Sequence, residues 1–578
     1  MPRIKILRNL TLVALAIITV RLFAIQILEH DIWVAKASDQ HTLLETITAG
    51  RGEIYMMDKG EPVAVVLNQT VYQIVIDPGF TDKDQIKSAL EKYAKDYIVV
   101  NLDEVYNTEG LRYSIVAKNV PYSIATKIAA EGIDYVWLKE GNSRVYPEGE
   151  MASTILGFVN ADGLGQYGVE GSLNHLLAGK DGTLKTVSDI NNVALSIGSD
   201  NIKIPAEDGK DIVLTIDRGL ESGVEEIMQD FLNNSSATNA AVLIMDPNTG
   251  EVLAMTALPN YDPADYGNVK DASAYLNQVT EVPYEPASIF KSFVYSAAIN
   301  EGKMSADTTF YNKGYENIDG NTIKNAEQRL NNQYVDMKTA LYWSFNTGSI
   351  HALKLLGDND AEITAAAREK LYDYYANKFR LNQPTGIELI ESEGFVWDPH
   401  AEIYGLNAAY ANMTFGQNLS ATMIETATAF SAVVNGGRYI TPTIVKGTLE
   451  KNGTITPLEN TEKIDEKILK ESTSATMREM LINNRSWKVR GGVDRPGYAI
   501  GGKTGTAQVL VNGAYDSSMQ NLVGSYIGFL GPSGELPQYV VMAKAWGEGQ
   551  ALQGTDVINL FDSISHFLIS YEKIQPVL

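Results

Sequence analysis

Residues 284–291 read YEPASIFK, and they place Ser288 and Lys291 three positions apart. Apolar residues recur at helical spacing through residues 289–299, which predicts a helix there. Residues i and i+3 share one face of a helix, so the serine hydroxyl and the lysine amine can meet. Serine is a weak nucleophile until a neighbour takes its proton, and a lysine can do so when its pKa is lowered by burial or by nearby positive charge. Ser288 is therefore a candidate nucleophile, with Lys291 as its candidate base.

Pro286 stands two residues before the serine and suits an extended entry into the start of a helix. The backbone N–H groups at a helix start are unpaired, and they can stabilise a developing oxyanion. A second Ser-x-x-Lys sequence occurs at residues 570–573, and we interpret it as chance.

A Ser-x-Asn motif follows at residues 344–346, which read SFN. The hydroxyl of Ser344 can relay a proton, and the amide of Asn346 can orient a substrate. The motif falls inside residues 337–356, whose apolar spacing predicts a helix.

The third motif is KTGT at residues 503–506, directly after YAIGG, and this pattern is typical of a strand that enters a site. Lys503 supplies a positive charge, while Thr504 and Thr506 supply hydroxyl groups. Gly505 has no side chain and lets a substrate backbone approach closely.

Each motif is weak alone, and the order of the three carries the argument. Ser344 follows Ser288 by 56 residues, and Lys503 follows Ser344 by 159 residues. Other copies of the two serine motifs in this chain do not fit that order. The ordered set is the signature of serine β-lactamases and penicillin-binding proteins.

The chain resembles the class B penicillin-binding proteins over nearly its whole length. These are monofunctional peptidoglycan D,D-transpeptidases of bacterial cell division and elongation. Residues 284–291 are similar to the family's YEPGSTFK block, and residues 501–508 (GGKTGTAQ) match its third motif almost letter for letter. Further similar blocks are RGEIY at 51–55 with Asp58, RVYP at 144–147, GQYGVE at 165–170, TID at 215–217, and NGG at 435–437 with Pro442.

Three positions depart from the family pattern. Ala287 replaces the usual glycine before the nucleophile, Ile289 replaces the usual threonine after it, and Phe345 stands where a small residue is common. We expect all three to lie at or beside the groove, where they would affect β-lactam affinity more than catalysis.

The resemblance implies a role for each residue of the first two motifs. Ser288 would attack the carbonyl between the two D-alanines of a stem peptide, and Lys291 would act as the base for acylation. Ser344 would relay the proton to the leaving D-alanine. Asn346 would hold the donor peptide and Lys291.

The resemblance also implies how the donor is bound. Lys503, Thr504 and Thr506 would bind its terminal carboxylate, with Gly505 between them. The backbone N–H groups of Ser288 and Thr506 would form the oxyanion hole. An amine from a neighbouring stem peptide would then resolve the acyl-enzyme into a cross-link.

The N-terminal half reads as mixed and strand-rich, with turn signals between the runs. A polar cluster at residues 233–236 is the best boundary candidate. After it, AAVLIMD, PNTG and EVLAMTA predict a hairpin from residue 240. Strand-like runs lie at 62–67, 71–76, 525–530 and 539–543, and helical patterns at 83–96, 220–232, 362–374 and 421–434.

The fold class that follows is α/β, in the α+β sense. A single transmembrane helix is followed by an elongated β-rich pedestal and a transpeptidase domain. In relatives that domain is a mostly antiparallel sheet flanked by helices. The expected boundaries are a cytoplasmic tail at 1–8, the transmembrane helix at 9–28, a pedestal or dimerisation-type module at 29–235, and the transpeptidase domain at 236–578.

Residues 9–28 read NLTLVALAIITVRLFAIQIL, which is long enough to cross a hydrocarbon core of about 30 Å as a helix. Arg3, Lys5 and Arg8 precede this stretch, so the positive-inside rule places the N-terminus in the cytoplasm and the rest of the chain outside. The alternatives are a signal peptide cleaved near residues 35–37 and a buried helix of a soluble domain.

Composition narrows the function classes. The net charge of −24 disfavours nucleic-acid binding, since so acidic a chain repels phosphates. With no cysteine, thiolate chemistry and disulfides are excluded. The six histidines are scattered and match no metal-ligand spacing. We therefore expect no cofactor and no metal.

The expected partners are stem peptides as donor and acceptor, β-lactam antibiotics, and a polytopic membrane glycosyltransferase that supplies the glycan. Two alternatives stay open. One is a D,D-carboxypeptidase or β-lactamase-like hydrolase on the same fold, which resolves the acyl-enzyme with water. The other is a catalytically weak scaffold or β-lactam sensor. Polymerisation of glycan by this chain itself is disfavoured, because residues 30–235 match the non-catalytic module.

Overall fold

The computed structural model describes residues 2–30, 32–33, 42–187, 202–458, 463–486, 494–508, 510–511, 514–515 and 520–577. The chain divides into two compact units. The first comprises Met1–Gly52 and Ala178–Lys210, and the second comprises Glu53–Leu177 and Asp211–Leu578. The candidate cleavage site at residues 35–37 lies outside the described residues.

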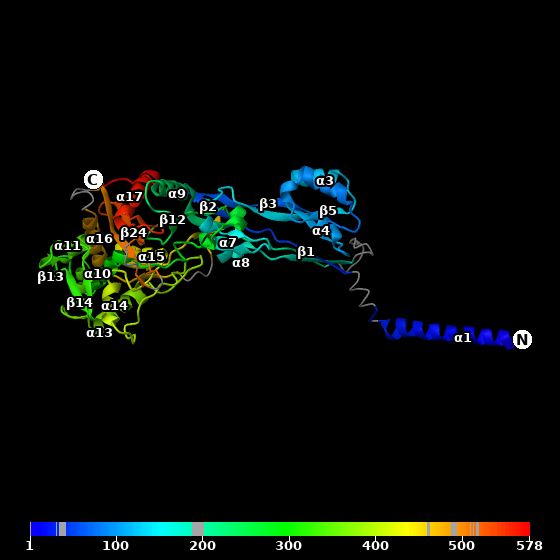
Figure 1. Ribbon diagram of the computed structural model, residues 1–578, viewed down its shortest axis with the longest axis horizontal. Coiled ribbons are helices and arrows are strands. Elements are labelled where there is room, and N and C mark those ends of the chain that lie inside the picture. Colours follow the sequence, from blue (N-terminus) through cyan, green and yellow to red (C-terminus); the bar gives the residue numbers. More distant parts are fainter. Residues whose placement is uncertain are drawn as a thin grey trace. The chain divides into compact units, whose positions relative to one another are not determined.

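The first unit contains the predicted apolar helix. Helix α1 (Pro2–Phe23) continues as a π-helical turn, η1 (Ala24–Leu28), and is drawn in dark blue in Figure 1. Its segment Ile4–Leu28 has a mean hydropathy of 2.2 and is the one helix in the described residues long and apolar enough to cross a membrane. The same unit holds a three-stranded antiparallel sheet in the order β1-β8-β9, with β1 at Thr42–Ile47, β8 at Gly182–Val187 and β9 at Ile202–Ile204.

The second unit contains a seven-stranded sheet. Its path runs β19-β18-β10-β2-β3-β4, and β5 also pairs with β3. Apolar side chains of β3, β4 and the covering helices form a separate core. The elements are β2 (Ile54–Asp58), β3 (Glu61–Ile76), β4 (Ser114–Pro121), β5 (Val136–Val145), β10 (Ile212–Asp217), β18 (Val445–Leu449), β19 (Ile455–Thr456), α3 (Lys83–Tyr93), α4 (Leu102–Asn107) and α5 (Tyr122–Ala130).

Strand β3 differs from the sequence expectation, because the two predicted runs at 62–67 and 71–76 form one strand of 16 residues. The polar residues 68–70 between them stay in the strand. Their backbone groups pair with β5, whose register is unbroken from Leu67 opposite Val145 to Ile76 opposite Val136. Backbone pairing with a partner strand thus outweighs the local polar composition.

Two of the similar N-terminal blocks meet in a buried ion pair. Nε of Arg144 donates to Oε1 of Glu170 at 2.7 Å, and both side chains are almost fully buried. A third block ends β10, where the Asp217 carboxylate caps helix α9 (Arg218–Asn233) by accepting the N–H of Leu220. These blocks therefore have structural roles in this chain: two of them form a buried ion pair, and the third caps a helix.

The second sheet has five antiparallel strands in the order β12-β11-β25-β24-β21. It contains the predicted hairpin and both predicted C-terminal strands. The strands are β11 (Asn239–Met245), β12 (Val252–Leu258), β21 (Tyr498–Gln508), β24 (Leu522–Pro532) and β25 (Tyr539–Trp546).

Side chains of this sheet alternate between two cores. On β11, Ala240, Val242 and Ile244 join the core under α9 and α17 (Gly554–Tyr571), whereas Ala241, Leu243 and Met245 join the larger core. Figure 1 shows α9 and α17 together on one side of the sheet. The opposite side is covered by α15 (Met423–Val434) and α16 (Glu471–Arg485), and α10 (Lys291–Asn300) packs against both of these helices.

The segment expected to be a helix at 337–356 is two helices, α11 (Met337–Tyr342) and α12 (Asn346–Leu356). The break lies at Ser344, whose φ of +56° is in the left-handed region. No glycine or proline marks the break in the sequence, so the apolar spacing predicts one continuous helix across it. The break places the Ser-x-Asn motif at a helix start. Further helices of this part are α13 (Ala365–Tyr372), the π-helical η6 (Asp373–Lys378) and α14 (Leu406–Met413).

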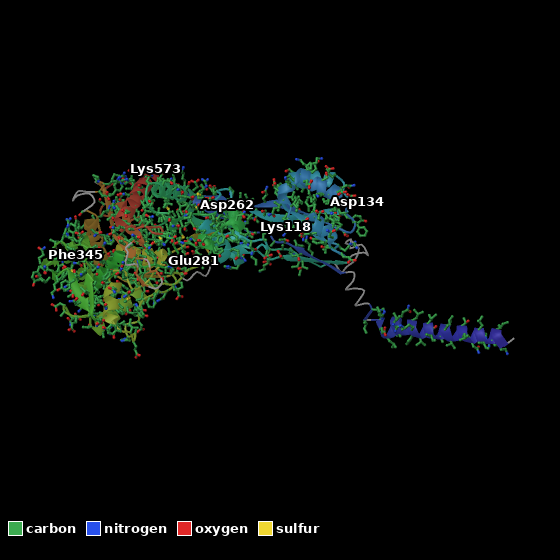
Figure 2. All side chains as sticks on the ribbon, viewed as in Figure 1. Lys118, Asp134, Asp262, Glu281, Phe345 and Lys573 are labelled. Carbon is green, nitrogen blue, oxygen red and sulfur yellow. The ribbon has the colours of Figure 1, made fainter. Side chains whose placement is uncertain are left out.

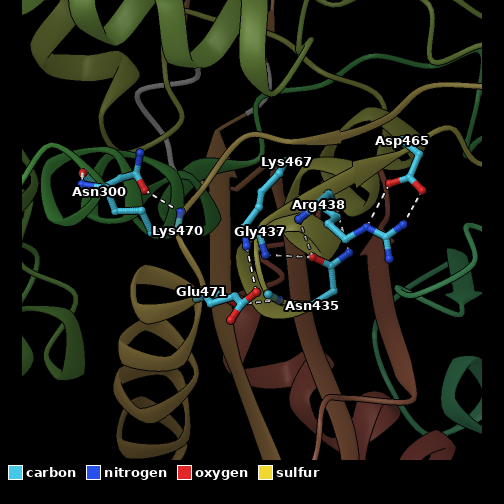
Figure 3. Close-up of polar contacts among 10 residues, drawn as sticks. Asn300, Asn435, Gly437, Arg438, Asp465, Lys467, Lys470 and Glu471 are labelled. Carbon is cyan, nitrogen blue, oxygen red and sulfur yellow. Dashed lines mark hydrogen bonds and ion pairs between the residues drawn. The ribbon is translucent and has the colours of Figure 1, made fainter.

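The NGG block at 435–437 forms the turn after α15, as Figure 3 shows. The Asn435 side chain holds the turn closed. Its Oδ1 accepts the N–H groups of Gly437 and Arg438, and its Nδ2 donates to the carbonyl of Pro247 at 2.7 Å. Gly437 has φ +97° and packs on the backbone of Leu469, so a side chain at this position would clash. The block is thus a structural turn that packs α15 against its neighbours.

Candidate active site

Ser288 lies in a short 3-10 turn, η5 (Ala287–Phe290), that leads directly into α10. In a 3-10 turn the residues i and i+3 are eclipsed, so Ser288 and Lys291 share one face as the sequence predicts. Ser288 is half-buried and Lys291 is only 1% exposed.

The entry into this turn differs from the expectation. Pro286 has φ −74° and ψ 0°, which is helical and not extended. The sharp change of direction is made by Ala287, whose φ is +51°. Its N–H donates to the carbonyl of Gly416 at 3.1 Å. Ala287, in a left-handed conformation and hydrogen-bonded to Gly416, thus positions Ser288.

Lys291 contacts the second motif. Its Nζ donates to the carbonyl of Ser344 at 2.6 Å and to the Oγ of Ser344 at 3.0 Å. Burial lowers the pKa of Lys291 well below its usual value, and the positive charge of Lys503 lowers it further. The lowered pKa favours the neutral amine of Lys291, which can accept a proton.

A buried polar network holds the loop that carries Ser344. The Oδ1 of Asn325 accepts the N–H of Thr347 at 3.0 Å, and the Thr347 hydroxyl contacts Asn312 and Asn325. Asn346 starts α12, and its Nδ2 donates to the carbonyl of Lys324 at 2.9 Å. Within the described residues, Asn346 makes no hydrogen bond to Lys291.

The third motif lies on β21, the edge strand of the sheet. Lys503 is 1% exposed, and burial lowers its pKa to about 7. Its Nζ lies 3.2 Å from the carbonyl oxygen and 3.3 Å from the Oγ1 of Thr504. Thr506 is exposed, and its Oγ1 accepts the N–H of Gly554 at 3.0 Å.

Gly505 brings this strand against the nucleophile turn. A Cβ at Gly505 would lie 2.5 Å from the carbonyl oxygen of Pro286 and 3.3 Å from the side chain of Ile289. Only glycine allows β21 to pack so closely beside η5. The fold therefore brings the three motifs together at one end of α10, beside the edge of the sheet.

The three residues that depart from the family pattern are buried next to motif residues. Ala287 is 4% exposed, and Ile289 and Phe345 are fully buried in the larger core. The turn geometry directs Ser288 outward and its two neighbours inward, and Phe345 (labelled in Figure 2) packs inside the domain.

Sequence reasoning missed two residues near this site. Gly416 packs on Ala287, and a lone glycine carries no motif signal. Lys544 on β25 is 3% exposed and stands opposite Ser525, which stands opposite Gly505. The sequence signal for Lys544 is its position in a run of apolar strand residues. Such a run predicts burial, and a lysine is almost never fully buried, so this position is unusual.

The arrangement can perform acyl transfer. It combines a serine on a turn, a buried lysine with a lowered pKa, a second hydroxyl in contact with that lysine, and a buried cation on a nearby strand. No group of three or more His, Asp or Glu residues that could hold a metal is present in the described part of the chain.

The sequence matches two protein families. Residues 240–562 match the family described as penicillin binding protein transpeptidase domain. Residues 46–214 match the family described as penicillin-binding protein dimerisation domain. The two ranges cover the second sheet with its helices and most of the N-terminal half.

Curated relatives and a solved structure are similar over most of the chain. Stage V sporulation protein D of Bacillus subtilis is 28% identical over 525 residues, covering 89% of this chain and 77% of that protein. A "Peptidoglycan D,D-transpeptidase FtsI homolog" of Mesostigma viride is 26% identical over 558 residues, covering 90% and 88%. The crystal structure of penicillin binding protein 3 of Mycobacterium tuberculosis with aztreonam has a TM-score of 0.66 and 23% identity, covering 92% and 98%.

Proposed function

The chain belongs to the penicillin-binding proteins that have a transpeptidase domain, and we propose that it cross-links peptidoglycan stem peptides through an acyl-enzyme on Ser288. The relative from Mesostigma viride has the same activity in its name. The observation that carries the proposal is the hydrogen bonding of Lys291 to both oxygen atoms of Ser344 beside Ser288.

In the acylation step, the Oγ of Ser288 attacks the carbonyl carbon between the two D-alanines. Lys291 takes the hydroxyl proton, and the negative charge moves to the carbonyl oxygen. Collapse of this intermediate breaks the peptide bond. The leaving D-alanine amine receives its proton through the hydroxyl of Ser344, which the Lys291 amine already contacts.

In the second step, the amine of a neighbouring stem peptide attacks the ester carbonyl. The amine loses a proton through the same two residues as the new amide bond forms. The Ser288–acyl bond breaks, and Ser288 regains its proton. The products are a cross-linked peptide, free enzyme and one D-alanine from the first step.

Donor binding uses the remaining motif residues. Lys503, Thr504 and Thr506 bind the terminal carboxylate, and Asn346 holds the donor backbone. The N–H groups of Ser288 and Thr506 stabilise the oxyanion, and one such donor is typically worth about 10²–10³ in rate. Support comes from the buried charge of Lys503 at the edge strand and from the close packing of Gly505 on the turn.

The membrane arrangement belongs to the same proposal. Residues 9–28 cross the membrane once, residues 1–8 lie in the cytoplasm, and the remainder lies outside. The module at 29–235 and the transpeptidase domain at 236–578 contain the two family matches, which supports this division. The chain synthesises no glycan, so a polytopic membrane glycosyltransferase supplies it.

The test uses the full chain in detergent with a fluorescent penicillin. The relative from Mycobacterium tuberculosis binds aztreonam, so a β-lactam is a suitable probe. We expect a stable one-to-one adduct by intact mass, absent in Ser288→Ala. Rapid turnover of penicillin without an adduct would show a hydrolase instead. A cross-linking assay with an amine acceptor then separates transpeptidation from carboxypeptidation by the product.

A further inference from the structure

A polar pocket lies away from Ser288, within the second unit. Its volume is about 400 Å³, which falls within the range of ligand-binding pockets. Strands β3, β4 and β5 line one side, the loop at 160–163 lines the second, and η3 (Pro263–Asn268) lines the third. Figure 2 labels Lys118 on β4 and Asp262, which directly precedes η3.

The lining is rich in amides and hydroxyls. Gln73, Asn119, Asn142, Ser143, Asn160 and Tyr266 all contribute to it. Amides offer both donors and acceptors, and hydroxyls do the same. Two cations, Lys118 and Arg144, and one anion, Asp162, complete the set. Such a lining suits a ligand with many hydroxyl and amide groups and little apolar surface.

The pocket wall contains a buried donor without a partner. Arg144 gives its Nε to Glu170 and its Nη1 to Asn68 at 2.8 Å. Its Nη2 has no hydrogen-bond partner among the described residues, although the side chain is 6% exposed. Buried polar groups are normally paired, so a ligand oxygen that reached this nitrogen would complete the hydrogen bonding of Arg144.

Two features hold the pocket in shape. The Oδ1 of Asn160 accepts the N–H groups of Asp162 and Leu164, which fixes the loop. The ring of Tyr266 stacks on Phe158 with centroids 4.2 Å apart and an 8° angle between planes. A fixed aromatic ring at a polar pocket offers an apolar surface for the C–H face of a sugar ring.

We propose that this pocket binds an N-acetylated saccharide unit of the peptidoglycan glycan. The inference rests on the proposed function, because the glycan strand carries the stem peptides that Ser288 would join. Hydroxyl and N-acetyl groups of the sugar meet the amides, and an oxygen atom satisfies Arg144. Binding here would hold a glycan strand on the pedestal while its peptides react elsewhere in the same unit.

The test titrates the full chain with the disaccharide of N-acetylglucosamine and N-acetylmuramic acid, without a stem peptide. Binding is followed by calorimetry. We expect saturable binding that falls at least threefold in Asn142→Ala and at least tenfold in Asn142→Ala combined with Tyr266→Ala. The exposed Asn107 ends α4 outside the pocket, and Asn107→Ala should bind as the wild type does.

The outcomes separate this inference from the proposed function. Penicillin acylation of Ser288 should stay within twofold of wild type in every variant. If wild type is acylated but the disaccharide does not bind, the pocket inference is wrong and the proposed function stands. It is equally wrong if maltose, which has no N-acetyl group, binds as tightly, or if penicillin competes with the disaccharide. If wild type is not acylated at all, the proposed function fails first.

Discussion

The side-chain amine of Lys291 donates two hydrogen bonds to Ser344, one to its carbonyl at 2.6 Å and one to its Oγ at 3.0 Å. A neutral amine has two N–H groups and one lone pair. Both N–H groups are then engaged by a single residue, and the lone pair remains to accept a proton. The lowered pKa of Lys291 favours this neutral form.

Replacing Lys291 should therefore abolish the base without removing the nucleophile. In Lys291→Arg, the guanidinium keeps its proton at any accessible pH, so it cannot accept one from Ser288. We expect the acylation rate with fluorescent penicillin to fall by about 10²–10⁴, the usual contribution of a general base. Stopped-flow or gel-based acylation rates measure this.

The second Ser-x-x-Lys copy provides a matched control. Lys573, labelled in Figure 2, is exposed and lies in the copy interpreted as chance. Lys573→Arg should acylate at the wild-type rate. An acylation rate in Lys291→Arg within threefold of wild type would exclude Lys291 as the base.

The acylation rate should rise and then fall with increasing pH, and a different lysine should cause each change. Lys291 must be neutral to act, so the rate rises as pH passes the lowered pKa of Lys291. Lys503 must be charged to bind a carboxylate, and its pKa is about 7, so the rate falls as Lys503 loses its proton above that pH. The second-order acylation constant reports these free-enzyme values.

Two substitutions at Lys503 assign the limbs. Lys503→Arg keeps the positive charge at all pH, so the alkaline limb should disappear and the acid limb should remain. Lys503→Met removes a charge that lowers the pKa of Lys291, so the acid limb should move to higher pH. An alkaline limb near pH 7 that persists in Lys503→Arg contradicts the assignment.

The residues of the candidate site could be predicted from sequence, because the motifs depend on residue types and their order. The sequence predicts Ser288, Lys291 and Lys503 as site residues in this way, and the turn residues predict the hairpin beginning at residue 240. Local signals of this kind depend on only a few neighbouring residues. The cap by Asp217 is another local signal.

The positioning of the site could not be predicted, because it depends on contacts between distant segments. The helix break at Ser344 has no local marker and is held by Asn325, 19 residues earlier in the chain. The left-handed φ of Ala287 depends on Gly416. The burial of Phe345 follows from packing in the larger core. In each case, contacts in the folded chain outweigh the preference of the local sequence.

Gly416 should be needed to hold the nucleophile turn. A Cβ there would lie 2.1 Å from the carbonyl oxygen of Ala287, and Gly416 itself has φ +74°. Gly416→Ala must therefore displace Ala287 and with it Ser288. We expect a loss of unfolding free energy of more than about 2 kcal/mol, combining the strain of a positive φ with the clash. Acylation by penicillin should fall at least tenfold.

Gly405 separates the two contributions. It has φ +79°, and a Cβ there would meet nothing within 4 Å. Gly405→Ala should lose only about 1 kcal/mol from its positive φ and should acylate normally. Chemical denaturation and acylation rates compare the two variants. Equal losses in both would mean that the packing of Gly416 on Ala287 has no importance.

Lys544 should destabilise the domain at neutral and acidic pH. Burial lowers its pKa to about 7, whereas an unfolded lysine titrates near 10.4. The described neighbours of its Nζ are the carbonyl of Gln278 at 3.4 Å and the rings of Tyr284 and Trp546 at 4.8 and 4.6 Å, and no carboxylate contacts it there. The unfolded chain binds the extra proton between these two pKa values, so stability rises with pH through that window. Below pH 7 the penalty is complete.

Lys544→Met removes the buried amine and keeps most of its volume, so it should raise the unfolding free energy by several kcal/mol at pH 6. The gain should shrink as pH rises toward 10, because the wild-type lysine is then neutral in both states. Urea unfolding at pH 6, 7.5 and 9 measures the difference. Lys451 is exposed, and Lys451→Met should change stability little at any of these pH values. If Lys544→Met is instead less stable than wild type at pH 6, the ammonium of Lys544 stabilises the native state, and its two aromatic neighbours are the contacts strong enough to do so.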